Sequence, residues 1–247
     1  MRRGNPGAAR INLAAPGSPH RKGGSRWRLL FGQASRVTDG SDCALLLCDL
    51  QNDFRHPDGA YARGGMGAPE IAALPARLAP LVRAMRATGG WVVSTHFTLV
   101  PGRDGEPFIS PHLRAARPFL RRGDFVPGGW GHALVDELGP ADLAVEKVAF
   151  SAFYQTRLEW VLARAGVRRL LVAGIVTNGG VASTVRDAHV QDFEVTVLED
   201  GCAAFDVKVH EVALAGLRGI AHLSSILNSA LLTELSISTP NESSGGQ

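Results

Sequence analysis

Acidic and basic residues stand at the ends of several apolar runs in this sequence. Asp49 follows the run "CALLLC", His96 stands near the end of "WVVSTHF", and Lys147 ends "LAVEK". A carboxylate near an ammonium group keeps its charge more readily and can pass a proton to or from a substrate held between them. Solvated or ion-paired charges are also common at such positions, so residue types alone leave both interpretations open.

These residues can act together only in a fold that brings the strand ends close to one another. Along the chain, short apolar runs alternate with segments whose apolar residues have helical spacing. We expect strands at residues 43–49, 91–97, 143–147, 168–175, 194–200 and 221–225. Apolar spacing predicts helices at residues 70–88, 155–166, about 180–191 and about 206–218. This alternation indicates an α/β fold with a parallel sheet covered on both sides, whose ligands bind at the carboxyl ends of the strands.

The stretch "GIVTNGGVASTVRDA", residues 174–188, leads from an expected strand into an expected helix. Strand-to-helix turns of this kind are a common place for a nucleophilic side chain. Here the turn holds two consecutive glycines, Gly179 and Gly180, which offer none. The turn therefore has the position of a nucleophile without the nucleophile.

Three segments carry a resemblance to a known family. They are "LLLCDLQNDF", "VEKVAFSAFYQTRLEWVL" and "VAGIVTNGGVASTVRDAHVQDFEVTVLEDGCAAF". Together, from about residue 42 to 227, they resemble the isochorismatase-like hydrolases, also called the cysteine hydrolase superfamily. The resemblance implies a Rossmann-like, three-layer α/β/α fold with a six-stranded, mostly parallel sheet, and assembly as a homodimer or homotetramer.

The resemblance also implies roles for individual residues. Amidase members of the family use an Asp–Lys–Cys triad, and its Asp and Lys match Asp49 and Lys147. The cysteine position falls on Gly180. Since glycine cannot form a thioimidate or acyl-enzyme, covalent amide hydrolysis by the family's usual route is not expected.

A backbone feature of the same turn is implied as well. In the family a cis peptide bond helps to direct backbone N–H groups at an oxyanion. The matching bond is Val176–Thr177, so we expect Val176, Thr177 and Gly179 to form an oxyanion turn. The nearby "SAF" segment, residues 151–153, is expected to support the pocket wall.

The three cysteines of the chain are not expected to replace the missing nucleophile. In a strand, the side chain of Cys48 points to the face opposite that of its neighbour Asp49. Cys43 lies at the other end of that strand, and Cys202 follows the fifth expected strand. We expect all three to be small buried apolar residues rather than a disulfide framework or a metal site.

Two functional hypotheses follow. In the first, Asp49 acts as a general acid that protonates the carbon of an enol ether, Lys147 tunes it or binds an anionic substrate, and Gly180 leaves room for water. In the second, the chain is an amidohydrolase-lineage paralogue of the ureidoacrylate or carbamoyl type that lost covalent catalysis and binds a ligand or partner. The amidase-like elbow and the segment "WGHALVDEL", residues 130–138, favour that lineage. A residue altered at position 180 is a third explanation of the glycine.

The substrate pocket is expected beneath the Pro- and Arg-rich segment from Phe97 to Trp130. We expect its binding residues to include Phe54, His96, Phe153 and Arg103, the last because an arginine fork suits a carboxylate. The metal-binding D-x-H pattern of zinc-containing relatives is missing around "STHFTLVPGRDGEPF". We therefore predict no metal and no cofactor, with a small molecule as substrate.

Charge and composition separate a basic terminus from the remaining chain. Residues 1–40 hold eight Arg or Lys and one Asp, which gives them a formal charge of +7. The formal charge of the whole chain is +3. The remainder is mildly acidic, which argues against a nucleic-acid surface. No apolar run is long enough to span a membrane, and no apolar segment of 7–15 residues follows Arg2-Arg3, so we expect neither a membrane span nor a secretion signal. We expect a disordered extension at 1–40, one domain at 41–232, a flexible tail at 233–247 and a cytoplasmic location.

Overall fold

Six parallel strands form one sheet in the computed structural model, which describes residues 40–229. The terminal segments predicted at 233–247 and, apart from Gly40, at 1–40 lie outside these residues. The strands are β1 (Cys43–Cys48), β2 (Trp91–Phe97), β3 (Leu143–Lys147), β4 (Arg169–Ile175), β5 (Glu194–Ala203) and β6 (His222–Ser224). The predicted α/β fold with a six-stranded sheet is confirmed, and every strand pair is parallel.

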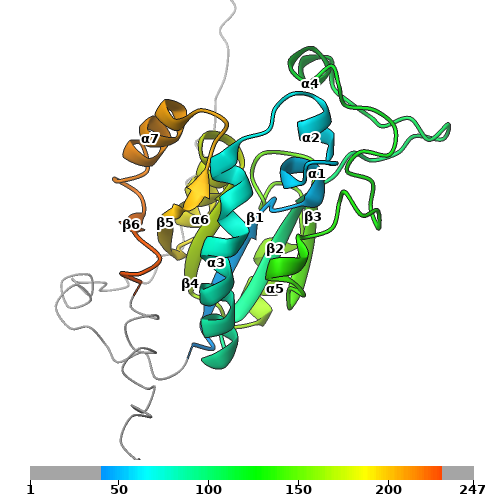
Figure 1. The fold of residues 1–247 in the computed structure, drawn as a ribbon. Coiled ribbons are helices and arrows are strands. Elements are labelled where there is room, and N and C mark those ends of the chain that lie inside the picture. The colour runs from blue at the N-terminus through cyan, green and yellow to red at the C-terminus, as the bar shows by residue number, and fades with distance from the viewer. Residues whose placement is uncertain (1–39, 230–247) are drawn as a thin grey trace, which may run out of the picture. The chain divides into compact units, whose positions relative to one another are not determined.

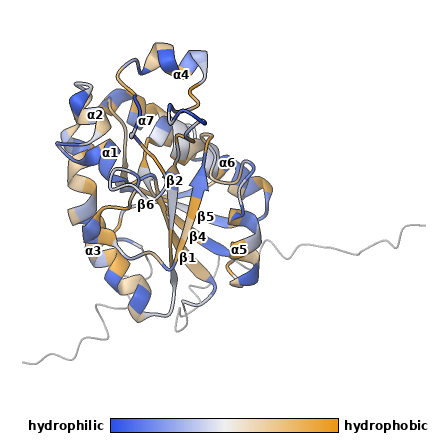
Figure 2. Cartoon of the chain, turned by 90° about the vertical axis from the view of Figure 1, so that its right-hand side faces the viewer, coloured by the Kyte–Doolittle hydropathy of each residue, from blue (hydrophilic) through white to orange (hydrophobic). Residues whose placement is uncertain are grey.

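Helices cover both faces of this sheet. The long helix α3 (Pro69–Ala87) packs on one face, and α5 (Leu158–Arg164) and α6 (Ala182–Val190) pack on the other, as Figure 2 shows from the side. The remaining elements are α1 (Asn52–Arg55), α2 (Ala60–Arg63), α4 (Pro111–Ala116), α7 (Val207–Ala215), and the short turns η1 (Asp136–Leu138) and η2 (Thr177–Val181). The three-layer prediction is therefore confirmed.

Strand β1 shows why its apolar run is continuous. Its side chains alternate between the two faces, so Leu45 and Leu47 enter the core against α3, while Leu46 and Cys48 enter the core beneath α5 and α6. All six residues of the strand are buried. A strand that is covered on both faces has no position for a polar side chain until it ends at Asp49.

The strand order β3-β2-β1-β4-β5-β6 determines where a ligand site forms. The chain moves outward in one direction from β1 to β3, then crosses back to β4 on the other side of β1. The crevice beyond the carboxyl ends of the strands at such a reversal is the usual ligand site of α/β sheets. Asp49 follows β1 and the turn η2 follows β4, so both lie at this position.

Residues 98–142 connect β2 to β3 across the carboxyl edge of the sheet, where α1, α2 and α4 also lie (Figure 1). Side chains of the "LQNDF" segment hold this connection in place. Gln51 donates to the carbonyls of Phe97 and His132, and Asn52 donates to the carbonyl of Trp130. These polar residues therefore hold residues 98–142, called the covering segment below, over the carboxyl edge of the sheet.

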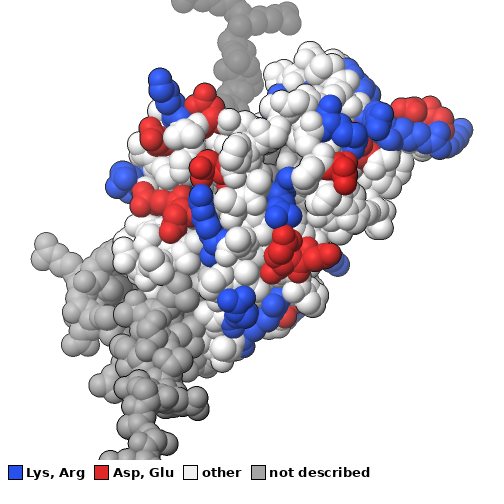
Figure 3. Space-filling view, in the orientation of Figure 1, with Lys and Arg blue, Asp and Glu red and all other residues white. Residues whose placement is uncertain are grey.

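The described surface carries charges of both signs. Figure 3 shows Lys and Arg side chains interspersed with Asp and Glu on the face in view, including the protruding loop between β2 and α4. Among residues 40–229, no helix has the length and apolar character needed to cross a membrane.

Candidate active site

A pocket of about 470 Å³ opens at the carboxyl edge of the sheet. Its charged floor is formed by Asp49 and Lys147, with Gly180 beside them. Its walls are largely apolar and aromatic, and they come from α1, α2, β2, α4 and the segments after β3, β4 and β5: Phe54, Tyr61, Phe97, Leu113, Val148, Phe150, Val176 and Phe205. The predicted catalytic positions therefore share one cavity.

Asp49 and Lys147 form a buried ion pair. Their Oδ2 and Nζ atoms are 2.6 Å apart, and the two residues are only 4% and 3% exposed. Lys147 Nζ also donates to the carbonyl of Ala149 at 3.0 Å. Burial raises the pKa of Asp49 above its ordinary value, although the charge of Lys147 and its hydrogen bond oppose this rise. Burial and the ion pair thus act in opposite directions on the protonation of Asp49.

Thr95 holds the other oxygen of this carboxyl group. Its Oγ1 donates to Asp49 Oδ1 at 2.8 Å and accepts from the Asp49 backbone N–H at 3.2 Å. Asp49 has φ 54°, in the left-handed region that Asp tolerates better than most residues. The turn at the end of β1 and the Thr95 hydroxyl together determine how Asp49 enters the pocket.

The strand-to-helix elbow differs from the prediction by one residue. The cis peptide bond lies at Ile175–Val176, so the prediction of Val176–Thr177 is wrong. The segment then makes one wide, π-helical turn, η2, before α6 begins at Ala182. Such a turn admits one more residue than an α-helical turn and often occurs at functional sites.

Gly180 lies where a side chain would enter the floor of the pocket. A Cβ atom at this position would lie 3.2 Å from Asp49 Oδ2 and 3.0 Å from the carbonyl oxygen of Ile175. A side chain here would thus contact the Asp49 carboxyl group directly. With glycine, that space next to Asp49 remains available to a substrate atom or a water molecule.

The other residues of the predicted oxyanion turn have different surroundings. Val176 lines the pocket, but Thr177 is fully buried and its Oγ1 lies 2.8 Å from Nδ1 of His210 on α7. Gly179 is buried against Val176 and Phe150. The oxyanion role of Val176, Thr177 and Gly179 stays a prediction.

The four predicted substrate-binding residues are separated by the fold. Phe54 lines the pocket and packs against Tyr61, with ring centroids 4.7 Å apart. Phe153 instead lies in the core beside Phe193, and Arg103 is exposed on the covering segment. Neither of these two residues lines the pocket.

His96 belongs to a separate polar network under the covering segment. Its Nε2 lies 2.8 Å from Ser94 Oγ, and its Nδ1 lies 2.9 Å from the carbonyl oxygen of His132. The His132 ring in turn contacts Thr98 Oγ1 at 2.9 Å. His96 therefore lines neighbouring cavities rather than the pocket around Asp49.

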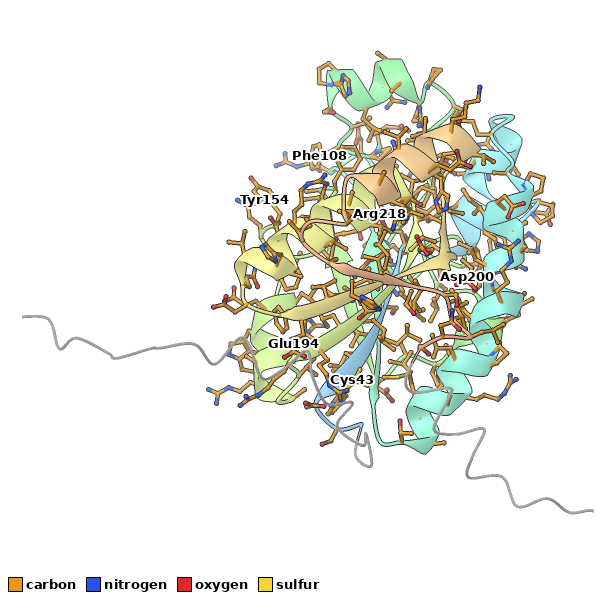
Figure 4. The ribbon with its side chains drawn as sticks, turned by 90° about the vertical axis from the view of Figure 1, so that its left-hand side faces the viewer. Cys43, Phe108, Tyr154, Glu194, Asp200 and Arg218 are labelled. Carbon is orange, nitrogen blue, oxygen red and sulfur yellow. The ribbon has the colours of Figure 1, made fainter. Side chains whose placement is uncertain are left out.

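All three cysteines of the chain are buried. Cys43 lies at the end of the sheet opposite α4 (Figure 4), and burial raises its pKa to about 11. Burial also raises the pKa of Cys202 to about 12 and that of Cys48 well above its usual value. These thiols stay protonated near neutral pH, and no cysteine is among the described residues that line the pocket.

The acidic pair at the end of the fifth predicted strand lies within β5 and is used structurally. Asp200 accepts a hydrogen bond from the backbone of Ile226 at 2.7 Å, and Glu199 pairs with Arg218 at 3.4 Å. Asp200 and Arg218 are labelled in Figure 4. Neither acid joins the Asp49–Lys147 pair.

Sequence reasoning missed several residues of the site. Thr95 reads as an ordinary strand residue, although it is one strand position from His96 and faces Asp49. Tyr61 and Phe205 stand outside the three family-like segments or at their edge, and Arg117 is one of five arginines in the covering segment. Only the folded chain distinguishes Arg117, which lines the pocket, from Arg103, which does not.

No group of three or more His, Cys, Asp or Glu side chains within residues 40–229 is placed to hold a metal ion. The absence of a metal and of a cofactor stays a prediction.

Comparisons with known proteins agree with this geometry. Residues 43–227 match the model of the Isochorismatase family, which describes the isochorismatase domain. The chain is 32% identical over 196 residues to ureidoacrylate amidohydrolase RutB of Methylobacterium radiotolerans, covering 72% of this chain and 74% of that protein.

Two solved structures illustrate the shared fold. An isochorismatase family protein from Desulfovibrio vulgaris has 27% sequence identity and a TM-score of 0.61, over 79% of this chain and 97% of the other. A cysteine hydrolase from Pseudomonas syringae has 20% identity and a TM-score of 0.68, over 81% and 94%. With the family match spanning most of the chain, this protein belongs to the isochorismatase family of hydrolases.

Proposed function

We propose that this protein hydrolyses a small anionic substrate without a covalent enzyme intermediate, using Asp49 as the acid–base residue and Lys147 as its partner. The observation that carries the proposal is the buried Asp49–Lys147 ion pair facing Gly180, in a pocket whose described lining holds no cysteine. The proton-transfer pair of the family triad is thus present, while the position matching its nucleophile has no side chain.

An enol ether is the bond class that suits this equipment. The neutral carboxyl of Asp49 gives its proton to the terminal alkene carbon, and the oxygen lone pair stabilises the resulting oxocarbenium ion. Water adds to the cationic carbon and loses a proton to the Asp49 carboxylate. In the hemiketal, the bond from carbon to the leaving oxygen then breaks, the hydroxyl proton passes to that oxygen to give the alcohol, and the carbon becomes the carbonyl carbon of a ketone. No group remains attached to the protein.

In this scheme burial favours the protonated form of Asp49, and Lys147 stabilises its carboxylate form. Burial raises the pKa of Asp49, and a bound substrate that excludes water favours the neutral, proton-donating form further. When the proton leaves, the ammonium group of Lys147 at 2.6 Å stabilises the new carboxylate. Gly180 leaves space beside Asp49 Oδ2 for the attacking water.

The test compares the parent with Asp49→Asn, Gly180→Cys and Gly180→Ala on matched enol ethers, amides and ureides. We expect the parent to hydrolyse an enol ether, and Asp49→Asn to lower kcat by about 10²–10⁴-fold, the usual contribution of a general acid. Gly180→Ala is the control for Gly180→Cys, because it adds the same Cβ close to Asp49 without a thiol.

Two results would overturn the proposal. Amide or ureide hydrolysis that appears in Gly180→Cys, but not in the parent or in Gly180→Ala, would indicate a pocket that has lost its nucleophile. A parent that binds small anions yet hydrolyses no member of the panel would indicate a ligand-binding paralogue, the alternative that its amidohydrolase relative suggests.

A further inference from the structure

Arg117, the residue that follows α4, brings a positive charge to the pocket wall. Its Nη1 donates to the neighbouring carbonyl of Ala116 at 2.8 Å, and its Cζ lies 5.8 Å from the ring centroid of Tyr61. Its Nε is shielded from solvent and has no hydrogen-bond acceptor. No described carboxylate lies within ion-pair distance of the guanidinium group. An arginine with unused donors beside a pocket is a binding group for an anion.

Tyr61 connects Arg117 electrostatically to the catalytic pair. The residue is 6% exposed, and burial raises the pKa of its hydroxyl. A hydrogen bond from Arg117 and the charge of that arginine lower this pKa, while the negative charge of Asp49 raises it. Asp49, Tyr61 and Arg117 all line the same pocket, so one small molecule can contact Arg117 and Asp49 together.

Aromatic rings form the space around these polar groups. The rings of Tyr61 and Phe205 are stacked, with centroids 5.2 Å apart and planes at 8°. Phe54 and Phe97 continue this wall, and Phe150, 69% exposed, stands at the mouth. Flat apolar groups gain most from such surfaces, because they bury large areas against ring faces.

The charges of the lining indicate the charge of the ligand. In the free site, before substrate binding favours the neutral form of Asp49, Asp49 and Lys147 cancel each other as an ion pair. Arg117 is then the unmatched formal charge among the described Asp, Glu, Lys and Arg residues of the lining. One positive charge balances a monoanion better than a doubly charged group. The planar guanidinium fork also matches the geometry of a carboxylate.

We infer that the substrate is a monocarboxylate carrying a flat apolar group, that Arg117 binds its carboxylate, and that the wall of Tyr61, Phe54 and Phe205 holds the flat group. The inference deepens the proposed hydrolysis, and it depends on that proposal in calling the bound molecule a substrate. It transfers the carboxylate-binding role expected of Arg103 to Arg117.

The test measures binding rather than turnover, using 3-phenylpropanoate, its neutral analogue 3-phenylpropanamide, and acetate. Isothermal titration calorimetry is applied to the parent, Arg117→Gln, Arg117→Lys and Arg121→Gln. Arg121 is the matched control, because it lies exposed on the same covering segment and its substitution removes the same charge. Circular dichroism checks that each variant is folded.

We expect the parent to bind 3-phenylpropanoate about tenfold or more tightly than the amide, as a charge-assisted hydrogen bond would give. Arg117→Gln should remove this preference, Arg117→Lys should keep part of it, and Arg121→Gln should keep all of it. Acetate should bind at least about tenfold more weakly than 3-phenylpropanoate, since it lacks the ring.

Several outcomes would overturn the inference. Equal affinity of the parent for acid and amide, or an acid preference that survives in Arg117→Gln, would remove the role of Arg117. Equal affinity for acetate and 3-phenylpropanoate would remove the role of the aromatic wall. An acid preference in a protein that hydrolyses nothing would support the binding site and reject the hydrolysis, so the two proposals fail separately.

Discussion

In the proposed reaction, two hydrogen-bonding partners control the carboxyl group of Asp49. Asp49 is held by Lys147 on one oxygen and by Thr95 on the other. Because burial and the two partners act on its pKa in opposite directions, losing one partner shifts the balance. Thr95 touches the carboxyl group and does not line the pocket, so it is a positioning residue.

Replacing Thr95 with Val should lower kcat by about tenfold or more while KM changes little, since the lost hydrogen bond is to a charged group. The hydrogen bond from Thr95 lowers the pKa of Asp49, so its removal should raise that pKa. A general acid works while protonated, and the fall of kcat at high pH should therefore move to higher pH. Steady-state kinetics across pH measures both effects.

Ser94→Ala is the control for this substitution, because Ser94 is the neighbouring buried strand residue and its hydroxyl contacts His96 instead. It should leave the pH profile of the parent unchanged. An unchanged pH profile in Thr95→Val, or an equal shift in Ser94→Ala, would contradict the positioning role.

Among the elements, the long connection from β2 to β3 is the least regular and supplies much of the site. Asp53 illustrates how it is held: its Oδ1 accepts from the N–H of Ala60 at the start of α2, and its Oδ2 accepts from the N–H of Phe125 at 2.7 Å. The "QND" side chains therefore replace regular secondary structure as the supports of the covering segment.

Gly131 lies against this Asp53 carboxylate, and a methyl group at its Cα would overlap the carboxylate oxygens. Gly131→Ala should therefore lower the free energy of unfolding by roughly 1–3 kcal/mol, the usual cost of overpacking. Chemical denaturation measures it, with Gly67→Ala as the control because a Cβ there meets open space. Equal stabilities of the two variants would show that the Asp53 side chain can move aside with little loss of unfolding free energy.

Boundaries of the regular elements show what local patterns can decide. The predicted strands 91–97 and 143–147 match β2 and β3 in both bounds. The helix predicted at 155–166 begins only at Leu158, since Gln155 has φ 53° and cannot continue a right-handed helix. Strand β5 runs past its predicted end at 200 to Ala203, because a register shift lets it pair again with Gly174 and Ile175.

Across residues 40–229 as a unit, buried histidines connect stability to pH. His132 is 6% exposed, and its pKa is lowered to about 4 by burial and then by His96. Its unfolded form takes up a proton as pH falls below about 6.5, while its folded form does so only near 4. Folding stability from this group is therefore complete above pH 6.5 and is lost as pH falls from there toward 4.

His132→Gln should reduce this dependence. Between pH 7.5 and 5 we expect the parent to lose about 1–2 kcal/mol of unfolding free energy more than the variant, as measured by urea denaturation. His56→Gln is the control, since His56 is at the surface beside Asp58. An identical loss in the parent and in His132→Gln would rule out His132 as the source.

Some expectations for the complete chain stay predictions: the homodimer or homotetramer implied by the resemblance, and the cytoplasmic location. The fold class and the family could be predicted because they depend on periodicity and on short motifs. Asp49, Lys147 and Gly180 each stand at the end of a strand or in a turn that neighbouring residues determine. Their meeting in one pocket then follows from the parallel sheet.

The tertiary structure alone decided the rest of the site. Arg117 lines the pocket and Arg103 does not, although both lie in an irregular segment without periodicity. Contacts such as Gln51 to His132, 81 residues apart, determine how that segment lies over the sheet. Thr95, the place of the cis bond and the core position of Phe153 likewise depend on packing between distant residues. Local sequence has no physical means of recording such contacts, because they exist only once the sheet has brought the segments together.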